Sequence, residues 1–204
     1  MECSKCGKFS CHKGDLDNLP NNCPAESDVL LEKFNEYKSN QGNENLALTA
    51  ARTESRGYKV WTRLEEIIQF SKSAGYKKLG LAFCIGLNKE ANKTTKILEN
   101  HGFEVASLVC KTGGFPKEDL GLKDDEKVNP GNFEPICNPI GQAELLNEAN
   151  TDFNIILGLC VGHDSLLIKY LEAPVTTFAV KDRALGHNPI MAIYCDYYMK
   201  SRFQ

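Results

Sequence analysis

The sequence lacks a strong charge of either sign and any long apolar run. Its 204 residues carry a formal net charge of −3, so there is no basic surplus of the kind that binds nucleic acid or an anionic membrane surface. No apolar run approaches the roughly 18 residues that a membrane-spanning helix needs, and the N-terminal residues have no signal-peptide core. We therefore expect a soluble, cytoplasmic protein whose partners include neither nucleic acid nor a membrane.

Two nucleotide-binding motifs are also absent. The chain has no G-x-G-x-x-G after its first expected strand and no G-x-x-x-x-G-K-[ST] anywhere, so nothing supports a dinucleotide or a P-loop nucleotide. The turn at 111–114, Lys-Thr-Gly-Gly, is only a weak candidate for holding an anion.

Cysteine, by contrast, is abundant. Nine cysteines are hard to explain as disulfides in the cytosol, where thiols stay reduced, so metal ligation is the leading interpretation. An odd total fits two groups of four and one remaining residue, Cys195, which we interpret as a core or surface thiol.

The first group lies within the N-terminal 23 positions. A C-x2-C pair lets two thiolates from one turn bind one metal, and two further thiolates complete a four-sulfur shell for zinc or an iron-sulfur cluster. The second C-x2-C pair of a zinc ribbon is missing, while the final Cys-Pro is similar to the end of bacterial ferredoxin motifs, although the spacings differ. His12 is a spare candidate ligand or a solvated loop residue. The expected ligands are Cys3, Cys6, Cys11 and Cys23.

The second group follows apolar runs that we expect to be strands. Cysteines stand at the ends of the runs 77–83, 103–109 and 153–157, and a fourth precedes a helix-like segment at 141–150. Each one alone can be a small core residue. Jointly, their spacing matches one strand-helix unit, and parallel strands of such units end at one edge of a sheet. We expect one shared site made by Cys84, Cys110, Cys137 and Cys160.

Strand-helix alternation from residue 77 onward predicts an α/β fold: a mostly parallel, Rossmann-like or flavodoxin-like sheet in three layers. Helices are expected at 25–38, 43–56, 61–73 and 88–101, and a fourth strand at 174–180. The long loop 111–134 has no apolar periodicity, and we interpret it as a lid or a mobile segment. The expected divisions are a metal module at 1–24, a helical segment at 25–76 and the α/β domain at 77–204.

Five other residues are candidates for catalysis near the strand ends. His163 and His187 would transfer protons near neutral pH, and Asp164 would orient an imidazole. Lys181 and Arg183 would hold an anion or balance the charge of a cluster. The alternatives are that His163 and Asp164 only begin a helix, with Asp164 as its N-cap, and that residues 181–183 are a surface charge cluster.

Several segments carry a resemblance to a known family. FCIGL around Cys84, CKTGG around Cys110, ICNPIGQAELLN around Cys137, LGLCVGHDSLLIKY around Cys160 and the segment APVTTFAVKDRALGHNP resemble a family of predicted metal-binding proteins of unknown function from anaerobic bacteria and archaea. The resemblance covers nearly the whole chain and implies metal binding and a mostly parallel α/β fold. More distantly, cysteines at several strand ends are similar to the cluster ligands of carbon monoxide dehydrogenases and hybrid-cluster proteins, an analogy of architecture alone.

Three hypotheses follow. The first is an iron-sulfur protein with 4Fe-4S clusters. Its N-terminal cluster would relay electrons from a redox partner protein, and its strand-end cluster would act on a small-molecule substrate. The second is a protein that binds zinc at its N-terminus for structure and captures a metal without turnover. The third, a thiol enzyme with Cys160 as nucleophile and His163 as base, leaves the other strand-end cysteines unexplained.

Overall fold

The structure is a computed structural model that describes residues 2–203. The chain forms two compact units, which divide between Arg56 and Gly57. Each unit is described by itself below.

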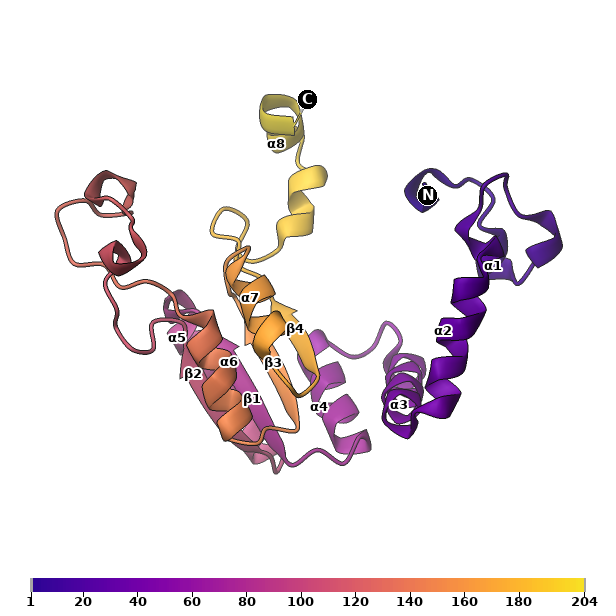
Figure 1. The fold of residues 1–204 in the computed structure, drawn as a ribbon, viewed down its shortest axis with the longest axis horizontal. Helices are drawn as coiled ribbons and strands as arrows, with labels where there is room; N and C mark the ends of the chain where they lie inside the picture. Colours follow the sequence, from indigo (N-terminus) through magenta and orange to yellow (C-terminus); the bar gives the residue numbers. More distant parts are fainter. Residues whose placement is uncertain (1, 204) are drawn as a thin grey trace. The chain divides into compact units, whose positions relative to one another are not determined.

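The N-terminal unit is built from short turns followed by two helices (Figure 1). Short 3-10 helices at Cys3–Lys5, Leu16–Asn18 and Pro24–Glu26 surround helix α1 (Ser10–Lys13), and the helices α2 (Asp28–Ser39) and α3 (Gln41–Gly57) follow. Both long helices form where the sequence predicts them. Helix α2 buries no residue, so its expected apolar face is exposed, at Val29, Leu30, Leu31, Phe34 and Tyr37.

The second unit is an α/β domain with one sheet. Four strands, all parallel, lie in the order β2-β1-β3-β4, which confirms the predicted fold class. This order matches the start of the flavodoxin-like arrangement, in which the order of the parallel strands across the sheet reverses between β1 and β3. The elements are α4 (Arg63–Ser73), β1 (Lys78–Phe83), α5 (Asn88–Asn100), β2 (Glu104–Val109), α6 (Pro139–Glu148), β3 (Phe153–Leu157), α7 (His163–Tyr170), β4 (Val175–Ala179) and α8 (Asp196–Tyr198).

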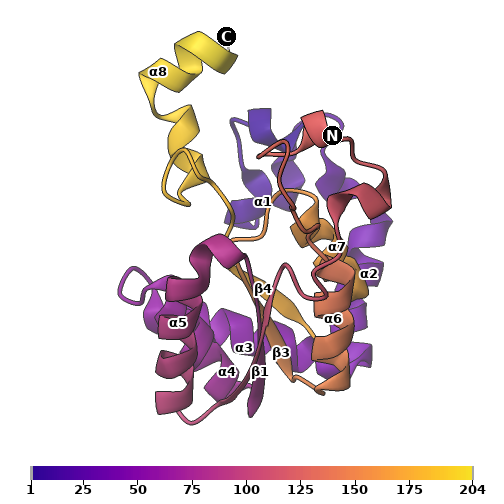
Figure 2. The ribbon, with the colours of Figure 1, turned by 90° about the vertical axis from the view of Figure 1, so that its left-hand side faces the viewer.

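Strand residues of alternating position pack on opposite faces of this sheet. Leu79, Leu81 and Phe83 of β1 belong to a core with α4 and α5, whereas Ala82 and Cys84 belong to a second core with α6 and α7. Figure 2 shows α5 on one side of the sheet and α6 on the other. The runs of β1 and β3 therefore read as continuously apolar in the sequence because both faces of these two strands are covered.

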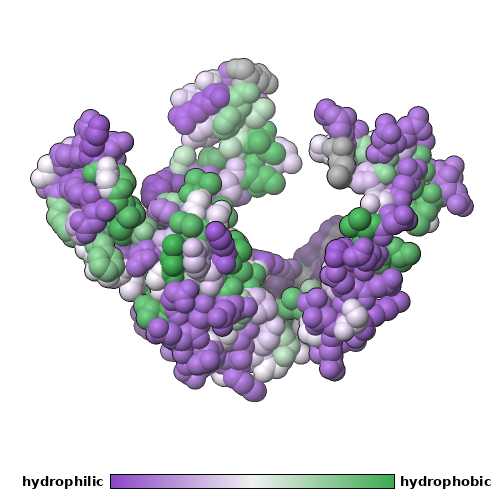
Figure 3. All heavy atoms as spheres, viewed as in Figure 1, coloured by the Kyte–Doolittle hydropathy of each residue, from purple (hydrophilic) through white to green (hydrophobic). Residues whose placement is uncertain are grey.

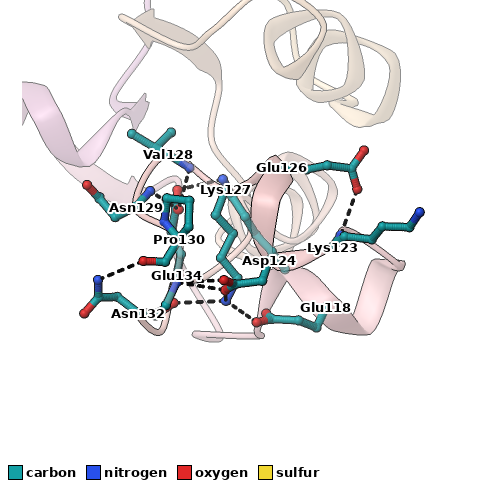
Figure 4. A network of polar contacts seen from close by, with 12 residues as sticks. Glu118, Lys123, Asp124, Glu126, Lys127, Val128, Asn129, Pro130, Asn132 and Glu134 are labelled. Carbon is teal, nitrogen blue, oxygen red and sulfur yellow. Dashed lines mark hydrogen bonds and ion pairs between the residues drawn. The ribbon is translucent and has the colours of Figure 1, made fainter.

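The segment between β2 and α6 differs from the expectation of a structureless lid. It contains 3-10 helices at Lys117–Leu120 and Asp124–Glu126, and a polar network holds it together (Figure 4). The Lys127 side chain is only 5% exposed and pairs with Glu118 and Asp124, while Lys117 pairs with Glu134 at 2.6 Å. The sequence shows no apolar periodicity here because ion pairs, rather than apolar burial, fold the segment.

Beyond β4, the chain makes short helical turns at Pro189–Ile193, α8 and Met199–Phe203. Apolar surface is visible on this segment in Figure 3, at Ile190, Met191, Ile193 and Phe203. Within residues 2–203, no helix is both long enough and apolar enough to cross a membrane.

Candidate functional site

Three of the expected site cysteines lie just beyond the carboxyl ends of adjacent strands. Cys84 and Cys110 directly follow β1 and β2, and Cys160 stands three positions after β3. The Cys84 N–H donates to the Leu157 carbonyl at 3.2 Å, and the Cys110 N–H donates to the Phe83 carbonyl at 2.8 Å. These bonds extend the sheet by one residue, so the cysteines stand at the edge where open parallel sheets bind ligands.

The fourth cysteine reaches this edge from the long segment before α6. The Asn138 N–H donates to the carbonyl of Cys110 at 2.8 Å, which fixes Cys137 beside Cys110. The Asn138 side chain also accepts a hydrogen bond from the Gly141 N–H at 2.9 Å and so caps α6. Residue 137 is therefore held between a strand end and a helix start.

Cys84, Cys110 and Cys137 are close neighbours whose acidities depend on one another. Cys84 and Cys110 are buried, at 6% and 2% exposure, and Cys137 is half-buried. The hydrogen bond from Cys110 lowers the pKa of Cys84 to about 5 and that of Cys137 to about 6, against the raising effect of burial. The same two hydrogen bonds, together with burial, raise the pKa of Cys110. Among the three thiols, Cys110 is therefore the one whose ionisation is disfavoured.

Cationic side chains surround these thiols. Lys181 contributes to the lowered pKa of Cys84, and Lys111 and His163 contribute to that of Cys137. Arg183 donates from Nη2 to the Cys160 sulfur at 3.4 Å. The hydrogen bond to Cys160 raises the pKa of the arginine, and the charges of Cys84 and Cys137 add to this rise. Cys84, Cys137 and Cys160 therefore all lie close enough to influence Arg183, and Cys110 neighbours the first two.

The other predicted catalytic residues separate into two sets. His163, Lys181 and Arg183 act on the thiols as just described, whereas Asp164 and His187 make local contacts. The Asp164 carboxylate accepts from the Ser165 N–H at 2.8 Å, at the start of α7. The His187 Nδ1 accepts from the Asp182 N–H at 3.1 Å, inside a turn. The N-cap of α7 is Gly162, with no side-chain hydrogen bond, so the N-cap alternative for Asp164 is wrong and this residue lies in the first turn instead. The contact of His187 gives that residue a place in the turn.

The structure adds residues that the sequence analysis did not select. Gln142 is fully buried, and its Nε2 donates to the carbonyl of Leu108 at 2.8 Å and to that of Phe83 at 3.5 Å. It therefore ties the ends of β1 and β2 together beneath the thiols. No local pattern identifies this role, because a glutamine on the polar side of a helix has the same sequence signature.

The N-terminal cysteines belong to a separate unit. Cys3, Cys6 and Cys23 line one pocket of about 500 Å³, whereas Cys11 is not among its lining residues. The Phe9 N–H donates to the Cys6 sulfur at 3.4 Å, and this hydrogen bond is the main cause of the lowered pKa of Cys6. Neighbouring His12 is exposed, and Cys195 belongs to neither group of cysteines.

Among residues 2–203, no three Cys, His, Asp or Glu side chains stand in an arrangement that could hold a metal ion as they are. At the strand ends, the Cys110 thiol interacts with those of Cys84 and Cys137, and the Cys160 sulfur accepts a hydrogen bond from Arg183. The donor chemistry nevertheless fits a thiolate-bound centre, because soft thiolate sulfur is the ligand that zinc and iron-sulfur clusters take. To bind such a centre, Cys110 would have to lose its proton and Cys160 would have to release its hydrogen bond from Arg183.

These features define a class: a parallel three-layer α/β protein with thiols grouped at the carboxyl edge of its sheet. Residues 23–178 match the family described as "Protein of unknown function (DUF1847)", and the chain belongs to this family. It is also 49% identical over 200 residues to "Uncharacterized protein MJ0455" of Methanocaldococcus jannaschii, an alignment that covers 98% of this chain and 97% of that protein.

Proposed function

We propose that this protein binds iron-sulfur clusters, with one cluster at the strand-end cysteines and a second at the N-terminal cysteines. The observation that carries the proposal is the meeting of Cys84, Cys110 and Cys137 at one edge of the sheet, with Cys160 bonded to Arg183 beside them. Four thiolates complete the shell that a 4Fe-4S cluster takes. Such a cluster supplies one-electron chemistry to a small-molecule substrate.

The chain's own residues prepare the strand-end site in three ways. Hydrogen bonding keeps Cys84 and Cys137 deprotonated, the form that binds metal. The Ile85 N–H donates to the Cys110 sulfur at 3.4 Å, and such bonds to sulfur tune a cluster's reduction potential. The third contribution comes from Lys111, Lys181 and Arg183, which offset the negative charge that collects when thiolates gather. Cys110 releases its proton as it becomes a ligand, so binding is favoured by higher pH.

The proposed N-terminal site rests on the pocket lined by Cys3, Cys6 and Cys23, with Cys11 as the fourth ligand. The N–H of Phe9 stabilises the thiolate of Cys6. We assign this site to electron relay between a redox partner protein and the strand-end site.

A second candidate is a zinc-binding protein without turnover. The same N-terminal pocket favours it, because four cysteine thiolates also form the closed tetrahedral shell of structural zinc. This candidate does not explain why Lys111, Lys181 and Arg183 lie around the strand-end thiols.

Metal analysis of protein purified without oxygen separates the two candidates. Iron, zinc and acid-labile sulfide are measured, with an optical spectrum, for the wild type, the pair Cys3→Ser/Cys6→Ser and the pair Cys84→Ser/Cys137→Ser. Cys195→Ser is the matched control, because Cys195 lies outside both groups.

We expect iron and sulfide in the wild type, a partial loss in each paired variant and no loss in the control. Zinc alone, lost only in the Cys3→Ser/Cys6→Ser variant, would refute the cluster proposal and leave the zinc candidate. Full iron content in the Cys84→Ser/Cys137→Ser variant would refute the strand-end site.

A further inference from the structure

The segment after β4 brings two cations to the strand-end thiols. The Lys181 N–H donates to the Leu159 carbonyl at 3.1 Å, which continues the pairing of β3 with β4 beyond the sheet. The lysine side chain then runs back across Gly158 toward Gly86. A Cβ added at Gly86 would lie 2.9 Å from the Lys181 Nζ and 3.9 Å from the Cys84 sulfur. The missing side chain at residue 86 is what lets the ammonium group reach Cys84.

Arg183 occupies the outer side of the same site. It is exposed, and its guanidinium uses one N–H on the Cys160 sulfur. An arginine carries five N–H donors in a fixed, planar fork that matches the two oxygens of a carboxylate or phosphate. Most of this donor capacity is still available beside the thiols.

No carboxylate neutralises these two cations. Within residues 2–203, neither Lys181 nor Arg183 has a carboxylate oxygen within the 4.0 Å of a salt bridge. Asp182, which lies between them in the sequence, is engaged elsewhere: it accepts from the N–H groups of Ala184 and Leu185, both at 2.9 Å. Asp164, in the first turn of α7, accepts from Ser165.

We propose that Lys181 and Arg183 bind the anionic group of a small molecule, a carboxylate or a phosphate, and hold it against the strand-end thiols. The inference rests on the proposed function in one respect, because it names the substrate class of the same site. Lys181 binds the anion on its inner side, next to Cys84. Arg183 binds it on the solvent side, next to Cys160. A ligand held between them touches the edge where the thiols converge.

The test is calorimetric titration of the full-length chain with two probes, acetate and inorganic phosphate, in chloride buffer at constant ionic strength. The wild type is compared with Lys181→Met/Arg183→Gln. Lys93→Met/Lys96→Met, on the exposed side of α5, is the control, because it also removes two positive charges. Iron and sulfide are measured on every sample.

We expect saturable binding of one probe by the wild type, at least a tenfold loss of affinity in Lys181→Met/Arg183→Gln and no change in the control. The probe that binds identifies the anionic group. Gly86→Ala keeps every charge but displaces the Lys181 ammonium, so it should weaken binding as well.

Three results would overturn the inference: no saturable binding by the wild type, equal binding by the Lys181→Met/Arg183→Gln variant, or a loss of binding in that variant no greater than its loss of iron, since the two cations would then act only through the cluster. A wild type that binds the anion but contains no metal would refute the proposed function and leave the inference standing.

Discussion

Replacing Cys110 with alanine should make Cys137 an ordinary thiol in the metal-free chain. The hydrogen bond from Cys110 is the largest cause of the low pKa of Cys137, about 6, and Cys137 is half-buried, so reagents can reach it. Without that donor, burial still disfavours the thiolate. The pKa of Cys137 should then rise toward or above the ordinary value of 9.0.

The size of the effect follows from the two pKa values. At pH 7, a thiol with a pKa of about 6 is roughly nine-tenths thiolate, whereas one at 9.0 is roughly one-hundredth thiolate. The more acidic thiolate is a weaker nucleophile, by about 16- to 30-fold for a Brønsted slope of about 0.4–0.5. The wild-type Cys137 should therefore react about three- to sixfold faster at pH 7 than the same thiol in Cys110→Ala.

The assay is alkylation by iodoacetamide in metal-depleted protein, followed at Cys137 by peptide mass spectrometry between about pH 5 and pH 10, which brackets the two pKa values. Cys110→Ser is the matched variant, because its hydroxyl retains a donor. We expect a midpoint near 6 for the wild type, a small upward shift for Cys110→Ser and a large one for Cys110→Ala. A wild-type midpoint near 9, or equal midpoints in wild type and Cys110→Ala, would refute the shared-proton arrangement.

Three further predictions test other parts of the molecule. Gly158→Ala should lower the free energy of unfolding in urea by more than Gly162→Ala does. Both residues have positive φ, and the backbone strain common to both substitutions is about 1–3 kcal/mol, but only a Cβ at Gly158 would meet a side chain, 2.0 Å from Leu87 Cδ1. Equal losses of stability would contradict this contact. Gln142→Leu should lower stability by about 1–3 kcal/mol through the lost bonds to the β1 and β2 ends and should increase hydrogen exchange at the Cys110 N–H, which an unchanged exchange rate would contradict. Acid should loosen the 117–134 segment, because ion pairing and backbone N–H donors lower the pKa values of Glu118, Asp124 and Glu134. Their stabilisation is complete above the ordinary values of 4.5 and 3.8 and is lost as the pH falls through the lower folded values. Asp124→Asn should remove most of this pH dependence from hydrogen exchange at Gly131, whose N–H donates to the Asp124 carboxylate.

The sheet and its thiol edge follow from local patterns in the sequence. The runs of β1 and β3 are buried on both faces, so they read clearly as strands, and β3 forms over the predicted residues 153–157. Parallel order then places the following residues at one edge. The cysteines after the runs come together because chain direction, rather than any long-range detail, sets where a parallel strand ends.

The parts that sequence patterns did not predict depend on contacts between distant residues. Lys127 is buried by carboxylates three and nine positions away, a fold without apolar periodicity. Gly86 matters through Lys181, 95 positions later in the chain, and no local pattern links them. Likewise, the spacing of the N-terminal cysteines does not reveal that Cys11 is not among the residues lining the pocket.

The simplest alternative for the strand-end cysteines, small apolar core residues, accounts for only part of what they do. Cys84 and Cys110 do pack in a core with Ala82, Ala143 and Leu146, and burial alone raises the pKa of a thiol. At Cys84, however, the pKa is lowered, by the hydrogen bond from Cys110, then by the N–H of Gly86 and by Lys181, against that burial. A cysteine that serves only as a packing residue is not expected to have three neighbouring groups that stabilise its thiolate. Under the proposed function, the core would supply the rigid floor of the site, and the donors and cations above it would prepare sulfur for a ligand, so the same atoms would serve both roles.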